Sequence, residues 1–340
     1  MPRILVGFIV SMLFMPGVQA GEGVAPVTGR PVHTYSIVAR DPHSGQLGVA
    51  VQSHWFSVGS LVPWARAGVG AIATQSFIEV RYGESGLDLM ASGLSATRTL
   101  DALLAADANP GVRQVAMIDA GGEVAVHTGE NCIEYAGHLT GNDFSVQSNL
   151  MISPGVQQAM ADAFQQATGT LAERMLAALE AAQAVGGDLR GKQSAAILVV
   201  DGTAGSRPRD GRLVDLHVED SPQPLVELRR LLRLHTAYAH MNQGDHALES
   251  GDVDAALHEY GQAEGLQPDN LEMKFWHAVS LVNAGRVDAA MPVFAGIFRD
   301  DARWRTLVQR LVQAGLLDAD AAVLARINTA GVKQEDRIND

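Results

Sequence analysis

Strand-like runs occur in consecutive pairs along this chain, and that order constrains the fold more than any other feature. "TYSIVARD" (34–41) and "QLGVAVQS" (46–53) are apolar, β-branched runs joined by a short turn containing Pro42 and Gly45. They predict a β-hairpin. "AGVGAIATQS" (67–76) predicts a third strand that is covered on both faces, because its apolar side chains point both ways. Two amphipathic helices are expected next, at 86–91 and after Ser95 as the cap.

The second half of this region repeats the alternation of strands and helices. Strand-like runs at 113–119, 123–128 and 144–150 precede one helix that starts at Ser153 and another with a capping box, Thr170 with Glu173. Two more strands follow, at 194–202 and 213–220. A doubly wound parallel sheet would alternate one strand with one helix. The order therefore predicts an α+β domain with two stacked sheets and helices outside them.

The C-terminal third contains an internal repeat. Three positions recur 34 residues later: Gly251 as Gly285, Ala256 as Ala290 and Tyr260 as Phe294. This period is the length of a tetratricopeptide repeat, a pair of helices that packs on its neighbours. We expect an all-α domain at 235–330, with one unit at 236–270, a weaker unit reaching 301 and a helical stretch at 304–327 as the cap. Such arrays usually need about three units, so this one should lean on the preceding domain.

The N-terminus has the pattern of a secretory signal. Arg3 precedes an apolar run at 4–15, and small residues lead to Ala20. We predict cleavage after Ala20, a periplasmic or secreted protein, and a linker or propeptide at 21–33. An uncleaved anchor is the alternative, although a membrane-spanning helix needs about 20 apolar residues. No membrane span is expected after signal removal, and residues 331–340 form a polar tail.

Composition excludes several classes of partner and cofactor. A net charge of −13 argues against nucleic acid, because phosphate binding needs clustered Lys and Arg. The one basic cluster, on a predicted helix at 229–233, reads as a solvated helix face. Cys132 is the single cysteine, so no intrachain disulfide forms, and the chain has no Cys/His spacing of a zinc site. We expect no metal and no cofactor.

Several motifs in the α/β region together carry a family resemblance. They are "TYSIVARD", "GVGAIATQ", "RQVAMID", "HTGENC", "QSN" and "GGDLRGKQSAAILVV". From Thr34 to about Leu232 the chain resembles DUF1028, a bacterial family of unknown function grouped with the N-terminal-nucleophile (Ntn) hydrolases. The resemblance implies a four-layer αββα sandwich at 34–234, in agreement with the element order. It also implies hydrolysis of an amide-type bond in an amide, a peptide or a cyclic imide.

Thr34 is the residue that the resemblance assigns as the nucleophile. An Ntn hydrolase needs Ser, Thr or Cys at a free N-terminus, because the α-amine, with a pKa of about 7.7–8.0, accepts the proton from the attacking group. Signal cleavage leaves 21–33 attached, so a second cut between His33 and Thr34, by autolysis or by another protease, is required. The alternative is that Thr34 is only the first residue of a strand.

Further residues are assigned to the site around Thr34. Ser53 could relay a proton, and Arg66 could lower the pKa of the nucleophile, unless each is an ordinary surface residue. The resemblance places Asn149 as an oxyanion donor, within a motif that has Ser148 where the family usually has Gly. The remaining residues are expected to bind substrate: Gln75, Gln147, Asp188, Arg190 and Gln193. Asp188 and Arg190 are either a site pair or a structural salt bridge.

Three functional hypotheses follow. The first is an exported amidohydrolase that uses Thr34 on a small molecule or peptide. The second is a non-catalytic scaffold that binds a ligand with the sandwich and a protein or peptide partner with the repeats. The third and weakest is an enzyme acting through Cys132, with His127 or His138 as its base. The sequence is compatible with a homo-oligomer.

Overall fold

The computed structural model describes residues 31–205 and 211–331. The predicted signal peptide, residues 21–30 of the predicted propeptide and residues 332–340 of the polar tail lie outside these ranges. No helix within them is both long and apolar enough to span a membrane.

Two antiparallel sheets form the α/β part. The six-stranded sheet has the order β10-β9-β2-β1-β8-β7, and the four-stranded sheet has the order β3-β4-β5-β6. The strands of the first are β1 (Thr34–Arg40), β2 (Leu47–Ser53), β7 (Gly137–Gly141), β8 (Phe144–Ser148), β9 (Ser194–Val200) and β10 (Arg212–Val218). Those of the second are β3 (Pro63–Arg66), β4 (Gly70–Ser76), β5 (Arg113–Asp119) and β6 (Val124–Thr128). The predicted hairpin is confirmed, because β1 pairs with β2 from Thr34↔Ser53 to Arg40↔Leu47.

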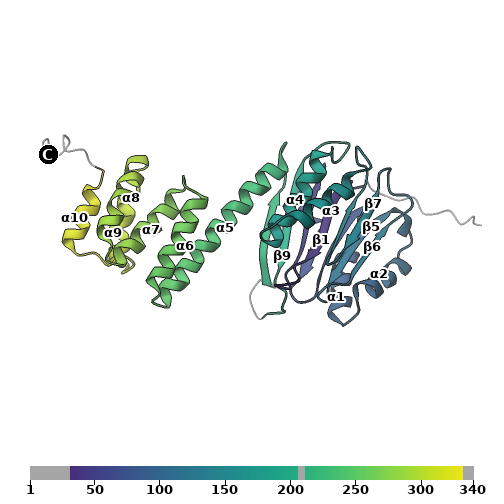
Figure 1. Ribbon diagram of the computed structural model, residues 1–340, viewed down its shortest axis with the longest axis horizontal. Coiled ribbons are helices and arrows are strands. Elements are labelled where there is room, and N and C mark those ends of the chain that lie inside the picture. Colours follow the sequence, from purple (N-terminus) through teal and green to yellow (C-terminus); the bar gives the residue numbers. More distant parts are fainter. Residues whose placement is uncertain (1–30, 206–210, 332–340) are drawn as a thin grey trace, which may run out of the picture. The chain divides into compact units, whose positions relative to one another are not determined.

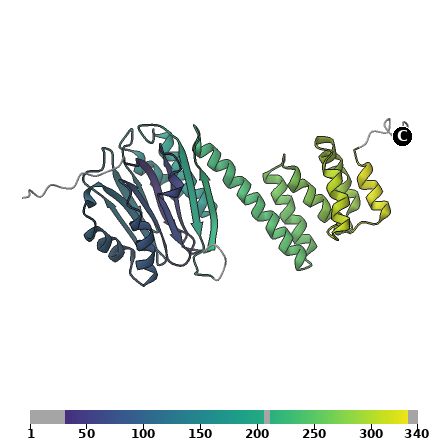
Figure 2. The ribbon, with the colours of Figure 1, turned by 180° about the vertical axis from the view of Figure 1, so that it is seen from behind.

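Helices cover the outer face of each sheet, which confirms the four-layer αββα sandwich. α3 (Val156–Gln166) and α4 (Leu171–Ala184) lie over the six-stranded sheet (Figure 1). α1 (Arg81–Ala91) and α2 (Ala96–Ala105) lie over the four-stranded sheet, as the view from behind also shows (Figure 2). Two short 3-10 helices, η1 (Val58–Ser60) and η2 (Pro110–Val112), lie in connections.

Odd- and even-numbered residues of β1 face two different apolar cores. Tyr35 and Ile37 belong to the apolar core that β1 shares with α3 and α4. Val38 belongs to the separate core between the sheets, together with Val49 of β2 and Ile118 of β5. Alternate side chains of a strand point to opposite faces, so the even-numbered residues of β1 face the other sheet.

Two strands, β3 and β7, were not predicted from the sequence, and both lie at sheet edges. β3 begins with a proline, which is tolerated at an edge because it needs no ladder hydrogen bond there. β7 contains glycine at both ends and is mostly exposed, so it lacks the apolar alternation of a buried strand. The helix expected to start at Ser153 begins at Val156, with Gly155 as its N-cap, but two other predicted N-caps are confirmed. Ser95 accepts a hydrogen bond from the Arg98 N–H, and Thr170 forms the complete capping box with Glu173.

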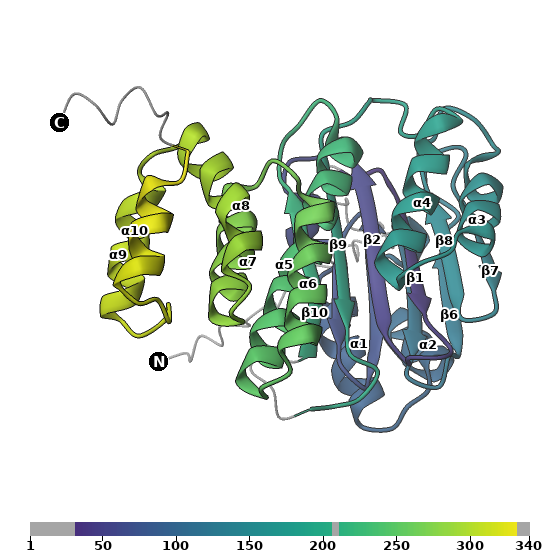
Figure 3. The ribbon, with the colours of Figure 1, turned by 60° about the vertical axis from the view of Figure 1, so that its left-hand side comes forward.

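Antiparallel helices make up the C-terminal part (Figure 3). They are α5 (Pro224–Glu249), α6 (Val253–Leu266), α7 (Leu271–Asn283), α8 (Val287–Asp300), α9 (Trp304–Gln313) and α10 (Ala321–Thr329). The recurring glycines of the sequence repeat, Gly251 and Gly285, follow α5 and α7 with φ of 81° and 73°. Glycine adopts this left-handed conformation without steric cost, so it ends the first helix of each pair. The stretch expected at 304–327 is two helices, because Gly315 ends α9 in the same way, with φ 71°.

The long helix α5 belongs to two cores. Leu228 and Leu232 pack in the apolar core of the six-stranded sheet and α4. Ala237 and Met241, further along α5, pack in a cluster that includes Ala256 of α6. The predicted domain boundary between residues 234 and 235 therefore lies inside a continuous helix.

Enlarging Ala256 will destabilise the repeat region. Ala256 is fully buried on α6, in one apolar cluster with Tyr260 and Met241. Ala256→Trp forces an indole into this packed space, and overpacking typically costs about 1–3 kcal/mol. We expect a lower midpoint in urea unfolding followed by circular dichroism. Ala256→Ser, which adds one atom, is the matched control, and equal midpoints for the two variants would contradict the packing argument.

Candidate active site

The space between the two sheets changes from apolar to polar at one end. Val38 and Val51 lie in the apolar inter-sheet core, whereas the next residues on the same face toward this end, Ser36 and Thr34 of β1 and Ser53 of β2, are polar. The polar side chains at this end are all buried: Thr34, Ser36, Ser53, Gln75, Gln114, Gln147 and Asn149. Buried polar groups cost free energy unless they are hydrogen-bonded, so a cluster of this size needs an internal network.

Gln114 of β5 is the centre of that network. Its Oε1 accepts hydrogen bonds from Gln75 Nε2 at 2.7 Å and from Asn149 Nδ2 at 2.8 Å. Its Nε2 donates to Thr128 Oγ1 at 2.9 Å and to the main-chain oxygen of Ser148 at 3.0 Å. These bonds join β4, β5, β6 and the end of β8, so the side chains are fixed by both sheets.

Ser36 connects two of the predicted substrate-binding glutamines. Its Oγ donates to Gln75 Oε1 and accepts from Gln147 Nε2, both at 2.6 Å. Gln147 also accepts from Ser145 Oγ at 3.0 Å. The structure therefore brings Gln75 and Gln147 together at Ser36, and Gln75 Nε2 also lies 3.4 Å from the Thr34 carbonyl oxygen.

The Thr34 hydroxyl is connected through Ser53 to the carbonyl oxygen of His33, the residue before it. Its Oγ1 is 3.0 Å from the Val32 carbonyl oxygen and 3.2 Å from Ser53 Oγ, and it can donate to either. The Ser53 hydroxyl in turn donates to the His33 carbonyl oxygen. Arg190 approaches the same oxygen, with its Nη2 at 2.8 Å. The carbonyl of the His33–Thr34 peptide bond is thus polarised by one hydroxyl and one guanidinium.

A glycine-rich loop positions Arg190. Gly187 and Gly191 have φ of 66° and 116°, conformations that favour glycine. Between them, Asp188 has a fully buried carboxylate that accepts from Arg190 Nε at 3.1 Å and Nη2 at 2.7 Å, and from the His54 main-chain N–H at 3.1 Å. Asp188 therefore holds the guanidinium in place, and the same guanidinium reaches the site. The pair is both a structural salt bridge and part of the cluster.

Asn149 contacts the site through its main chain and its side chain. Its N–H donates to the Thr34 carbonyl oxygen at 3.1 Å. The side-chain Oδ1 accepts from His33 Nδ1 at 2.9 Å, and Nδ2 is bound to Gln114. The two hydrogen-bond donors to the His33 carbonyl oxygen are therefore Ser53 and Arg190. The Asn149 side chain is bound instead to the His33 imidazole.

His33 is buried and its pKa is shifted. Burial lowers the pKa of His33 below its ordinary value of 6.5, and the Arg190 charge lowers it further. The hydrogen bond with Asn149 and the Asp188 charge act in the opposite direction. The net effect favours a neutral imidazole at neutral pH.

Acid will weaken the uncleaved chain through His33. As pH falls through 6.5, an unfolded chain protonates this histidine before the folded chain does, so the free energy of unfolding decreases below pH 6.5 and levels off above it. We expect the full chain carrying Thr34→Ala to lose stability relative to Thr34→Ala/His33→Gln between pH 7 and pH 5 in urea unfolding. A difference between the two chains that stays constant over this range would contradict the assignment.

Two predicted site residues lie apart from Thr34. Arg66 is at the far end of β3, where it pairs with Gly70, and its guanidinium forms an exposed ion pair with Asp88 at 2.9 Å. Ser76 ends the same β4 strand that Gly70 begins, about 20 Å away along the strand. The Gln193 side chain is bound outside the cluster, where its Nε2 donates to Asp220 Oδ1 at 3.1 Å. Its main-chain N–H does reach the cluster, where it donates to the Ser53 carbonyl oxygen.

The proposed Cys132 dyad is not formed in the described chain. Cys132 Sγ lies 3.4 Å from the Arg113 carbonyl oxygen, and burial raises the pKa of its thiol. His127 hydrogen-bonds to the Pro110 carbonyl oxygen at 2.8 Å, and His138 to the Thr128 hydroxyl at 2.9 Å. A reactive thiol needs a lowered pKa and a basic neighbour, so this environment does not support Cys132 as a nucleophile. Among the side chains that the structure places, no group of His, Cys, Asp and Glu is arranged to hold a metal ion.

Two residues of the cluster, His33 and Gln114, were not predicted from the sequence. Gln114 could have been identified from the alternation of side chains along its strand, because it shares a face with Ala116 and Ile118, both in the inter-sheet core. A glutamine at an inward position of an apolar strand needs buried partners, which is a signal for a polar site. His33 precedes the first strand and has no comparable signal.

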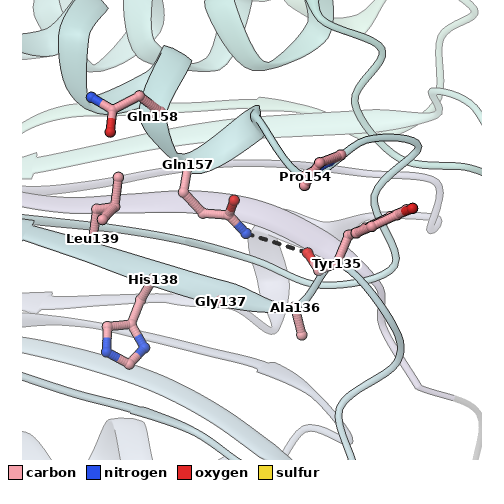
Figure 4. A pocket seen from close by; sticks show the side chains of 8 residues that line it. All are labelled: Tyr135, Ala136, Gly137, His138, Leu139, Pro154, Gln157 and Gln158. Atoms are coloured by element: carbon pink, nitrogen blue, oxygen red, sulfur yellow. Dashed lines mark hydrogen bonds between the residues drawn. The ribbon is translucent and has the colours of Figure 1, made fainter.

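A separate open pocket of about 500 Å³ lies at the β7 edge (Figure 4). Its lining residues are Tyr135, Ala136, Gly137, His138, Leu139, Pro154, Gln157 and Gln158. Gln157 donates to the Tyr135 carbonyl oxygen at 3.3 Å, the contact drawn in Figure 4, and to Ser148 Oγ at 2.7 Å. None of the residues predicted to act with Thr34 lines this pocket, whereas His138, the base considered for Cys132, does.

Comparisons with known proteins agree with this division of the chain. The model of a family of unknown function, DUF1028, matches residues 34–228, more than half of the chain, and a tetratricopeptide model matches 247–314. A crystal structure of a protein from Silicibacter pomeroyi, described with the same family model, is 28% identical with a TM-score of 0.54. The match covers 60% of this chain and 89% of that one. No curated protein matches. The tetratricopeptide-like repeats suggest interaction with another protein.

Proposed function

This chain belongs to the family of unknown function DUF1028, and from that premise we propose that it is an amide-bond hydrolase with Thr34 as its nucleophile. The observation that carries the proposal is the polarised carbonyl of the His33–Thr34 bond. Its oxygen accepts from Ser53 Oγ and from Arg190 Nη2, and Thr34 Oγ1 is itself hydrogen-bonded to Ser53. A hydroxyl beside a carbonyl with two fixed donors is the arrangement that acyl transfer requires.

The same arrangement supports self-processing. Thr34 Oγ1 attacks the His33 carbonyl carbon, and its proton passes through Ser53 toward the carbonyl oxygen. The C–N bond to Thr34 then breaks as this same proton moves from the hydroxyl of the tetrahedral intermediate to the nitrogen, which leaves an ester between His33 and Thr34 Oγ1 and a free α-amine on Thr34. Water hydrolyses the ester, releasing the segment that ends in the His33 carboxylate. Another protease acting at the same bond would give the same products.

After cleavage, Thr34 has the amine that its hydroxyl needs. The free α-amine accepts the proton from Oγ1 and later returns it to the leaving amine of the substrate. A nearby positive charge lowers the pKa of an amine, so Arg190 favours the neutral, basic form of this group. Ser53 and Arg190, the donors that bind the His33 carbonyl, stabilise the developing oxyanion of the substrate.

Export is a second part of the proposal. It rests on the signal-like pattern of residues 1–20, and it would place the enzyme in the periplasm or outside the cell. Ala20→Arg should retain the precursor, because signal cleavage needs a small residue at that position. The repeats add a binding role for a protein or peptide partner, whether or not the sandwich is catalytic.

The N-terminus of the purified protein tests the proposal directly. We expect mass spectrometry of exported wild-type protein to show a chain beginning at Thr34, and the Thr34→Ala protein to retain residues before 34 if processing is autocatalytic. Processing of Thr34→Ala by cell extract would assign the cut to another protease and leave the hydrolase proposal intact. A fully active protein that still begins at Gly21 would contradict it.

A further inference from the structure

Residues 31–33 occupy the site as the acyl part of a substrate would. Thr34 follows them, and the carbonyl that it would attack belongs to His33. We propose that the cleaved site takes peptides, bound on their acyl side as a short strand that replaces Val32 and His33. This inference rests on the proposed function, because it identifies the substrate class of the Thr34 site.

Main-chain pairing at Ser76 is the first support for a peptide. The Val32 N–H donates to the Ser76 carbonyl oxygen at 2.7 Å, and the Ser76 N–H donates to the Val32 carbonyl oxygen at 3.0 Å. This is an antiparallel bridge one residue before His33. β3 pairs with β4 only as far as Ala73, so Val32 covers the part of the β4 edge that β3 leaves open.

Cleavage after His33 removes Val32, the residue that pairs with Ser76 at the edge of β4. Ser76 is almost fully buried, and buried main-chain N–H and C=O groups require hydrogen bonds. Once residues 31–33 depart, both groups of Ser76 become available to another extended chain. Addition of a peptide strand to an open sheet edge is a common mode of peptide recognition, in which main-chain bonds provide affinity.

Side-chain contacts define the preference at two positions. Val32 is buried in the inter-sheet apolar cluster, so the penultimate residue of the acyl side should be apolar and β-branched. His33 is also buried, with Nδ1 bound to Asn149 Oδ1 at 2.9 Å. The last residue should therefore be a planar side chain with a hydrogen-bond donor.

A small amide would form fewer of these hydrogen bonds. It can place its carbonyl against Ser53 and Arg190, but it leaves both main-chain groups of Ser76 and the Asn149 Oδ1 without a partner. Sites built to hydrogen-bond a ligand discriminate strongly against one that lacks the matching groups. We therefore expect peptides to be preferred over simple amides.

Binding to the uncleaved full chain tests the inference without requiring catalysis. Two further substitutions are made in the Thr34→Ala background. Val32→Pro removes the N–H that bonds to Ser76, and His33→Gly removes the imidazole, so the internal segment binds its own site poorly. The probe is acetyl-Pro-Val-His-amide, measured by calorimetry. We expect its Kd for this triple variant to be at least about tenfold lower than for Thr34→Ala alone, in which the segment competes.

The matched control is the same peptide with N-methylvaline, which lacks only the N–H directed to Ser76. We expect it to bind at least about tenfold more weakly. Equal binding of the two peptides, or no binding of either to a triple variant with a wild-type circular dichroism spectrum, overturns the inference.

Turnover by cleaved wild-type protein separates the two proposals. We expect acetyl-Pro-Val-His-anilide to exceed acetanilide in kcat/KM by at least about 100-fold. Equal turnover of both anilides contradicts the peptide preference and leaves the hydrolase intact. Discriminating binding with no hydrolysis of any amide keeps the peptide site and overturns the proposed catalysis.

Discussion

Thr34→Ala in a protein produced with residue 34 as its first residue will lower kcat/KM for amide hydrolysis by at least about 10³-fold, because it removes the attacking hydroxyl. Thr34 is fully buried, and the hydrogen bonds of its Oγ1 go to Val32 and Ser53 and not to the strand ladder, so the strand itself should be preserved. The measurement is steady-state hydrolysis of a peptide anilide, with circular dichroism to verify the fold.

Two controls separate loss of the nucleophile from loss of structure. Thr34→Ser retains a hydroxyl and should retain part of the activity. Wild-type protein extended by a few residues before Thr34 has the hydroxyl but an amide nitrogen in place of the amine, so it should be inactive until it is cleaved. Full activity of the Thr34→Ala protein would exclude this mechanism and return the choice to a binding role.

Arg190→Met will destabilise the sandwich by about 3–5 kcal/mol. The Asp188 carboxylate is fully buried, and Arg190 supplies its only charged partner among the described residues. Removing the guanidinium while keeping the stem leaves a buried charge held by main-chain N–H groups alone. The free energy of unfolding from urea titration of the uncleaved chain is the measurement.

The double variant Asp188→Asn/Arg190→Met is the control for that prediction. It removes both charges, so it should be more stable than Arg190→Met alone, since most of the single-variant loss comes from the uncompensated carboxylate. A double variant that is no more stable than the single variant would show that Arg190 stabilises the loop by another route. Both variants should also process more slowly, because the His33 carbonyl loses its charged donor.

The architecture followed from local patterns because those patterns are set by short-range physics. Apolar, β-branched runs at 34–41 and 46–53 with turn residues between them identified the hairpin, and the capping box of Thr170 identified the start of α4. The 34-residue recurrence of Gly251 identified the helical pairs, since glycine ends a helix in the left-handed conformation. Edge strands β3 and β7 escaped detection because they bury little and so carry little pattern.

The site could be predicted only in part, because most of its members meet through pairing between distant segments. The family motifs pointed to Thr34, Asn149 and Arg190, which the structure brings together around His33. The same reasoning included Arg66, which β3 and β4 carry to the opposite end of the sheet. The sequence places Arg66 on a strand, but it does not specify at which end of the sheet that residue lies.

The sequence by itself determined the two classes of domain, because apolar strand runs, helix caps and a repeat period are properties of neighbouring residues. The candidate nucleophile came from the family resemblance. Only the tertiary structure decided what surrounds Thr34. It showed that His33 and Val32 occupy the site, that Gln114 holds the network together, and that Arg190 rather than Arg66 is the charge at the His33 carbonyl. The physical reason is that these contacts depend on the register and stacking of two sheets, which bring together residues more than a hundred positions apart.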